Sequence, residues 1–77
     1  MENLNSRLKK VFAETLALAD VPETLSQKNC PEWDSVNHLN LVIALEAEFD
    51  VVFEPEEISA MTDFSVVRSA ISKKSEV

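Results

Sequence analysis

The middle of the chain contains the three side-chain types of a hydrolytic triad, in Asp34, Ser35 and His38. In such a triad the carboxylate orients the imidazole, which accepts the proton of the hydroxyl. The three residues stand almost adjacent at the start of an expected helix, so the carboxylate cannot easily reach the imidazole while that ring faces the hydroxyl. The chain also has no glycine, the residue of the sharp turn that presents the nucleophile in many hydrolases. A hydrolase is therefore a lesser alternative, and we expect His38 to be a surface residue of the helix.

Ser35 is a candidate for modification rather than for catalysis. A hydroxyl at a helix N-terminus, beside a long loop, is well placed to carry a phosphate ester. The unpaired backbone N–H groups and the positive end of the helix dipole would stabilise the charge of that ester. The other interpretation is that Ser35 is a small, exposed residue of the first helical turn without a function of its own.

Two further features, an acidic loop and a cysteine, are of the kinds that bind metal or react, but the residues around each do not match the requirements of such a site. Residues 50–61 have the length and acidity of a calcium loop, but Pro55 replaces the required glycine and Met61 replaces the closing glutamate. Cys30 is the one cysteine of the chain, so it cannot form an intrachain disulfide or a cysteine-rich zinc site. We expect a partly exposed, incidental thiol, because no neighbouring base is evident that would lower its pKa.

The length of 77 residues predicts one domain over residues 1–77, with a core at about 3–72. The lack of glycine excludes the phosphate-cradling loops of nucleotide-hydrolysing and dinucleotide-binding proteins. Charged residues interrupt the first twenty positions, and no stretch is apolar enough to cross a membrane. We expect a cytoplasmic, metal-free monomer that does not insert into membranes.

The charges are distributed unevenly along the chain. There are 14 acidic and 7 basic residues, and no Lys or Arg lies between Cys30 and Asp63. We call residues 30–63 the base-free stretch. Such a surface would repel nucleic acid and anionic lipid, and it would attract a basic protein partner.

Hydrophobic periodicity predicts four helices. The first covers residues 3–19, and a long loop over residues 20–34 follows, which is expected to be functional or held by its own apolar side chains. Asp34 is a good N-cap for a second helix over residues 35–49. An apolar loop over 50–54 leads to a short third helix that begins at Pro55. Thr62 or Asp63 caps the fourth helix, in which one face holds Phe64, Val67 and Ile71, and residues 72–77 are expected to be a frayed tail.

The second helix is apolar on two faces. One face contains Leu41, Val42, Leu45 and Phe49, and the roughly opposite one contains Val36, Leu39, Ile43 and Ala47. A small domain cannot easily enclose both faces, so one of them is expected to be a docking surface. The predicted fold class is all-α, a small four-helix bundle with a long first loop and a short third helix.

These elements carry a sequence that closely resembles the acyl carrier proteins. The family signature is Asp-Ser-Leu at the start of the second helix, and this chain has WDSV at residues 33–36. The helix continues as LNLVIALEAEF at 39–49, which includes the Leu-Glu-x-x-Phe pattern of the family, and FEPEEI follows at 53–58. The resemblance extends from Leu4 to about Ile71.

The resemblance implies a specific chemistry. Ser35 would be esterified with 4'-phosphopantetheine, donated from coenzyme A by a holo carrier protein synthase, which is a phosphopantetheinyl transferase. The terminal thiol of this arm would carry acyl groups as thioesters, and the chain itself would catalyse nothing. Asp34 matches the acid that helps the transferase engage the site.

The resemblance also implies two further sets of residues. The partners would be acyl-loading and acyl-transferring enzymes with basic patches, and the contact positions would be Val36, Ile43, Glu46 and Asp50. An acyl-holding cleft between the helices would be lined by Leu45, Phe53, Ile58, Met61 and Val67.

Departures from the family pattern favour a specialised carrier. Val36 replaces the usual leucine, Trp33 replaces the usual glycine two residues before the serine, and Ala47 replaces an acid. Neutral side chains occupy the front of the second helix, at Asn37, His38 and Asn40. We expect a role in a lipid, polyketide, polysaccharide or aminoacyl pathway. The alternatives are the housekeeping carrier of fatty-acid synthesis and a helical protein-interaction module in which Ser35 is never modified.

Overall fold

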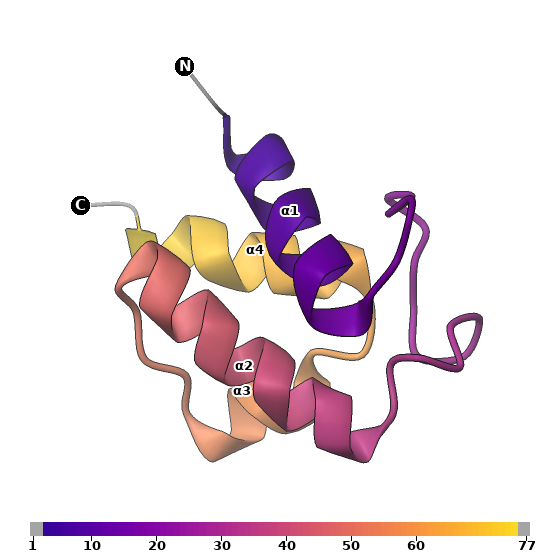
Figure 1. Ribbon diagram of the computed structural model, residues 1–77. Helices are drawn as coiled ribbons and strands as arrows, with labels where there is room; N and C mark the ends of the chain where they lie inside the picture. Colours follow the sequence, from indigo (N-terminus) through magenta and orange to yellow (C-terminus); the bar gives the residue numbers. More distant parts are fainter. Residues whose placement is uncertain (1–2, 76–77) are drawn as a thin grey trace.

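The computed structural model describes residues 3–75, which form four helices. They are α1 (Leu4–Leu16), α2 (Ser35–Phe49), α3 (Pro55–Ala60) and α4 (Phe64–Ser75) (Figure 1). No strand forms within residues 3–75. An isolated antiparallel β-bridge joins Ser26 and Asp63. The predicted all-α class, the bounds of α2 and the start of α3 at Pro55 are confirmed.

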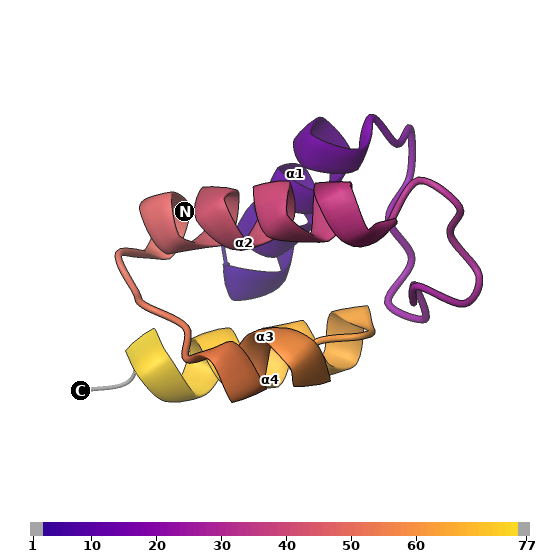
Figure 2. The same ribbon diagram turned by 90° about the horizontal axis from the view of Figure 1, so that it is seen from below.

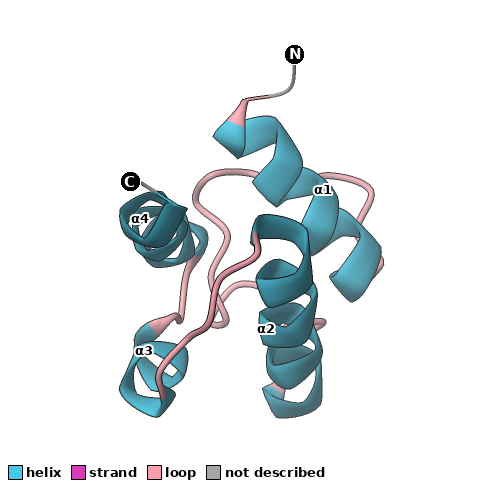
Figure 3. Ribbon diagram, turned by 90° about the vertical axis from the view of Figure 1, so that its left-hand side faces the viewer, coloured by secondary structure: helices cyan, strands magenta, loops and turns pink. Residues whose placement is uncertain are grey.

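The helices form two layers. Figure 2 shows α1 and α2 on one side and α3 and α4 on the other, and Figure 3 shows the same division from another direction. The first helix packs against both α2 and α4. The long segment over residues 17–34 lies at the end of the bundle where α2 begins, as both Figure 1 and Figure 2 show. Ser35 therefore lies at the junction of this segment with a packed helix.

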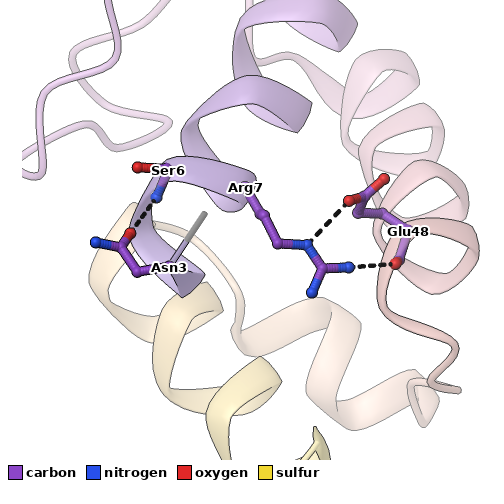
Figure 4. Close-up of polar contacts among 4 residues, drawn as sticks. All are labelled: Asn3, Ser6, Arg7 and Glu48. Carbon is purple, nitrogen blue, oxygen red and sulfur yellow. Dashed lines mark hydrogen bonds and ion pairs between the residues drawn. The ribbon is translucent and has the colours of Figure 1, made fainter. Parts of the chain in front are cut away.

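The first helix is shorter than the sequence predicts. Its N-cap is Asn3, whose Oδ1 accepts a hydrogen bond from the backbone N–H of Ser6 at 2.8 Å (Figure 4). It ends at Leu16, before the predicted end at residue 19, because Ala17 adopts the left-handed conformation with φ 55° and ψ 48°. The N–H of Leu18 then donates to the carbonyl of Ala13 at 3.0 Å, which closes the helix end.

The second helix ends in the same way. Asp50 is left-handed, with φ 54° and ψ 52°, and the N–H of Val51 donates to the carbonyl of Glu46 at 3.2 Å. Glycine is the usual residue in this conformation, because any side chain adds a steric cost there. In a chain without glycine, neither helix end carries the usual C-terminal signal.

The C-terminal helix is longer than the sequence predicts. Asp63 caps it, since its Oδ1 accepts from the N–H of Val66 at 2.8 Å, and the helix continues to Ser75 instead of fraying from residue 72. The Nζ of Lys74 lies 2.8 Å from Oε1 of Glu57 and 5.6 Å from the ring centroid of Phe53. These contacts tie the last turn of α4 to α3, whereas residues 76–77 of the predicted tail lie outside the described residues.

One core cluster joins all parts of the bundle. Its aromatic centre is Phe12, whose ring centroid lies 5.2 Å from Trp33 in an edge contact and 5.1 Å from Phe64. The long segment contributes to the core with four buried side chains, which are Val21, Leu25, Cys30 and Trp33. Its own apolar side chains thus hold this segment in place, which was one of the two explanations expected for its length.

Candidate functional site

Ser35 is the first residue of α2, and it is exposed. The preceding Asp34 has extended backbone angles, and its Oδ1 accepts a hydrogen bond from the N–H of Asn37 at 2.9 Å. This is the predicted N-cap, and the carboxylate satisfies one of the N–H groups that a helix start leaves unpaired. The hydroxyl of Ser35 is therefore presented to solvent from a fixed helix start, where an enzyme could reach it.

The segment before Ser35 is tied to the first turns of α2. The side-chain Nδ2 of Asn37 donates to the carbonyl of Glu32 at 2.8 Å, and the N–H of His38 donates to the carbonyl of Asp34 at 2.8 Å. The N–H of Trp33 donates to the carbonyl of Cys30 at 3.0 Å, so residues 30–33 form a turn. These bonds fix the direction in which the chain enters α2.

The structure does not assemble a triad from Asp34, Ser35 and His38. The carboxylate of Asp34 caps its own helix, while both ring nitrogens of His38 are engaged elsewhere. Its Nδ1 lies 2.9 Å from Nε1 of Trp33, and its Nε2 lies 2.8 Å from the carbonyl oxygen of Ile58. The expectation of a plain surface histidine is wrong, since the ring is half-buried and bridges two other segments.

This role of His38 does not follow from helical periodicity. The signal that points to it is the buried indole of Trp33, which is 2% exposed and carries an N–H group that needs an acceptor. A histidine five residues further along the chain is a suitable acceptor, but only the folded structure shows that the two rings meet.

An apolar stripe runs along the solvent-facing side of α2. Val36, Leu39 and Ile43 are 70%, 59% and 64% exposed, and we call these three residues the outer face. The opposite side of the helix buries Leu41, Val42 and Leu45, which we call the inner face. The predicted second apolar face is thus present and open to solvent, and it includes Val36 and Ile43, two of the residues expected to contact partners.

The two acidic residues expected to contact partners, Glu46 and Asp50, differ in their surroundings. Glu46 is half-buried, and its Oε2 accepts a hydrogen bond from the N–H of Phe53 at 2.9 Å, which anchors the loop after α2. Asp50 is exposed and forms the left-handed end of α2. The sequence shows that both residues are acidic. It does not show that Glu46 contacts the backbone of Phe53, because this contact depends on the path of the loop.

Glu48, the other acid within α2, is also engaged within the fold. The guanidinium of Arg7 contacts Glu48 through Nε, 3.1 Å from the carboxylate Oε2, and through Nη2, 2.9 Å from the backbone carbonyl (Figure 4). The same guanidinium lies 4.7 Å from the ring centroid of Phe49. Arg7 thereby joins α1 to the C-terminal end of α2, although it lies outside the base-free stretch in the sequence.

The predicted cleft residues lie together in the interior. Leu45, Phe53, Met61 and Val67 belong to the buried core, and Ile58 packs against it. Leu45 belongs to α2, Ile58 to α3 and Val67 to α4. Phe53 lies in the loop after α2, and Met61 lies in the turn after α3. Their shared location is consistent with an apolar interior between the two layers of helices.

Cys30 differs from the expectation of partial exposure. It is 3% exposed, because it packs within the core cluster beside Trp33. Burial raises the pKa of the Cys30 thiol, and the hydrogen bond from its Sγ to Oε1 of Glu32 at 3.5 Å acts in the same direction. The protonated thiol is a poor nucleophile, so Cys30 is a structural residue.

Residues 3–75 contain neither a cluster of metal-ligating side chains nor a helix that could cross a membrane. Within that range no group of three or more His, Cys, Asp or Glu side chains is arranged to hold a metal ion. The stretch 50–61 consists of a loop followed by α3 rather than an ion-binding loop. None of the described helices has the length and apolar character needed to cross a bilayer.

The comparison with known families adds no assignment. No protein-family model matches this chain.

Proposed function

We propose that the chain is an acyl carrier protein whose 4'-phosphopantetheine arm is attached to Ser35. The observation that carries this proposal is the position of Ser35, exposed as the first residue of α2 and next to the N-cap Asp34. The same residues form the WDSV sequence that resembles the signature of the family. In the attachment step the Ser35 oxygen would bond to the phosphorus of the phosphopantetheine group. The adenosine bisphosphate part of coenzyme A would leave, and the hydroxyl proton would pass to a base of the transferase.

The surroundings of Ser35 support this chemistry. A phosphodiester at the start of α2 would lie near the positive end of the helix dipole, which favours negative charge. The chain holds Ser35 on a packed helix but leaves its side chain in solvent. A tethered acyl group on a flexible arm would then reach each docked enzyme at high effective concentration.

Docking would use the outer face together with the acids at its C-terminal end. Val36, Leu39 and Ile43 offer apolar contact, and Asp50 is an exposed acid one residue beyond α2. A basic patch on the partner would be attracted at low ionic strength, and salt would slow this association. The neutral side chains of Asn37 and Asn40 favour a specialised pathway over the housekeeping carrier of fatty-acid synthesis.

The test is the intact mass of the chain after incubation with coenzyme A and a phosphopantetheinyl transferase of broad specificity. We expect a gain of one phosphopantetheine group in the wild type and no gain in Ser35→Ala. Ser65 provides a matched control, because it is also exposed in the first turn of a helix capped by an aspartate. Ser65→Ala should still gain the full mass.

The alternative is a helical interaction module that is never modified, and the exposed outer face is the observation that favours it. The mass experiment separates the two proposals. An unchanged mass of the wild type, or a gain that survives Ser35→Ala, would contradict the carrier function and leave the interaction module as the better account.

A further inference from the structure

His38 is held in one defined protonation state by its two partners. The indole Nε1 of Trp33 can only donate a hydrogen bond, so the Nδ1 of His38, 2.9 Å away, must accept it with a lone pair. In a neutral imidazole the ring hydrogen is then on Nε2, which donates to the carbonyl of Ile58 at 2.8 Å. The neutral ring protonated on Nε2 is the form that satisfies both contacts.

These two bonds join three segments of the fold. Trp33 lies near the end of the long segment before α2, His38 belongs to α2, and Ile58 belongs to α3. The two aromatic rings are also stacked obliquely, with their centroids 6.0 Å apart. Since Trp33 is buried against Phe12 and directly precedes Asp34, its position influences how the chain enters α2 at Ser35.

We propose that His38 is a proton-sensitive clamp on the segment that leads to Ser35. A proton taken from solvent on Nδ1 would place an N–H group directly opposite the indole N–H of Trp33. Two donors cannot share a hydrogen bond, so this contact breaks, whereas the bond from Nε2 to Ile58 can remain. Protonation therefore frees the indole N–H of Trp33 and removes one of the contacts that hold residues 30–34, while the bond to α3 remains. This inference does not depend on the modification of Ser35.

The acidic residues in the segments next to the imidazole of His38 are exposed or have partners other than this ring. The preceding segment carries Glu32, which accepts from the Cys30 thiol, and Asp34, which caps α2. The third helix carries Glu57, which pairs with Lys74, and the exposed Glu56, while the exposed Glu54 is its N-cap. Within residues 3–75, none of these five acids makes a hydrogen bond or ion pair with the imidazole.

The chain is well suited to a direct test. Histidine is the side chain that ordinarily changes charge between pH 5 and 8, and this chain has one histidine and one tryptophan. The raised pKa of Cys30 and the lowered pKa of Glu57 move both groups away from the range between pH 5 and 7. A transition of the Trp33 indole in that range can therefore be compared directly with the protonation of His38.

The experiment is nitrogen and proton NMR of the full chain. At pH 7.5 we expect the ring nitrogens of His38 to show an unprotonated Nδ1 and a protonated Nε2. As the pH is lowered until the nitrogen shifts show the ring of His38 doubly protonated, hydrogen exchange of the Trp33 indole N–H, corrected for its intrinsic pH dependence, should become about tenfold faster, as expected for the loss of one buried hydrogen bond. The midpoint should coincide with that of the imidazole. The amide of Val67, in the core of α4, should keep its protection.

The matched variant is His38→Gln, whose amide can both accept and donate but does not titrate in this range. It should show no step in the exchange of the Trp33 indole between pH 7 and 5. The proposal is overturned by a neutral ring protonated on Nδ1, by unchanged exchange at Trp33 while His38 protonates, or by an equal loss of protection at Val67. These three outcomes are measured on the wild type, so they decide the question even if His38→Gln does not fold.

Discussion

The inner and outer faces of α2 have the same kinds of side chain and opposite surroundings. Leu41, Val42 and Leu45 are buried where α1 packs against the helix, whereas Val36, Leu39 and Ile43 are open to solvent. Hydrophobicity alone does not distinguish the two faces. The difference shows that the neighbouring helices decide which face becomes core, and that the other face is left available for contact with another molecule.

The largest expected effect comes from the inner face. Leu45→Ala should lower the free energy of unfolding by about 2–5 kcal/mol, because it removes buried methyl groups and leaves a cavity. Leu39→Ala makes the same change on the outer face and should alter stability by no more than about 0.5 kcal/mol. Urea denaturation of both variants measures the difference. Similar losses in the two variants would contradict the assignment of the faces.

The second prediction concerns docking and rests on the proposed function. Ile43→Gln should lower kcat/KM for the transferase or a loading enzyme about tenfold, because burying an apolar side chain of this size in an interface contributes about 1.5–3 kcal/mol when the contact is complete. Its urea midpoint should match that of the wild type. An unchanged kcat/KM would mean that the outer face does not take part in docking.

The third prediction compares the two acids at the C-terminal end of α2. Glu46→Gln should cost about 1 kcal/mol of stability, since it weakens a charge-assisted hydrogen bond with the N–H of Phe53. Asp50→Asn should have little effect or a small favourable one, because asparagine tolerates the left-handed conformation and removes a negative charge from a helix C-terminus. Thermal unfolding compares the two variants. A larger loss from Asp50→Asn would reverse the roles assigned to these acids.

The smallest expected effect on stability concerns the ion pair between α3 and α4, which lies away from both faces of α2. The ion pair and hydrogen bond with Lys74 lower the pKa of Glu57 below its ordinary value of 4.5. Its contribution to stability is therefore present above pH 4.5 and is lost as the pH falls through the lower, folded-state pKa.

Lys74→Met tests this contribution. The stability difference between the wild type and Lys74→Met, followed by denaturation at several pH values, should be largest near neutral pH and should shrink below pH 4.5. If the stability difference between the wild type and Lys74→Met grows on acidification, the ion pair of Lys74 with Glu57 does not account for the contribution of Lys74 to stability.

Local signals were sufficient to predict most of the secondary structure. The bounds of α2 follow from Asp34 as N-cap and from the apolar periodicity up to Phe49, and the start of α3 follows from Pro55. The end of α1 does not follow from the sequence, because alanine, which stands at position 17, is not a residue that usually marks a left-handed helix end. The last turn of α4 does not follow from local signals either, because the contact of Lys74 with Glu57 joins distant parts of the chain.

The candidate site was predictable only in part. The exposure of Ser35 follows from the helix pattern, which also shows two apolar faces on α2 but does not decide which of them is open to solvent. The burial of Cys30, the bond from Trp33 to His38 and the contact of Glu46 with Phe53 depend on how the long segment and the loop after α2 pack. Such contacts between segments leave no periodic signal in the sequence. The attachment of a cofactor to Ser35 stays a prediction.

The most direct test of the carrier function is the mass of the peptide that contains Ser35, taken from the chain purified from its own cells. We expect this peptide to carry one phosphopantetheine group bonded to Ser35 and the peptide with Ser65 to be unmodified. A Ser35 peptide without this group under all growth conditions in which the chain is made would contradict the account.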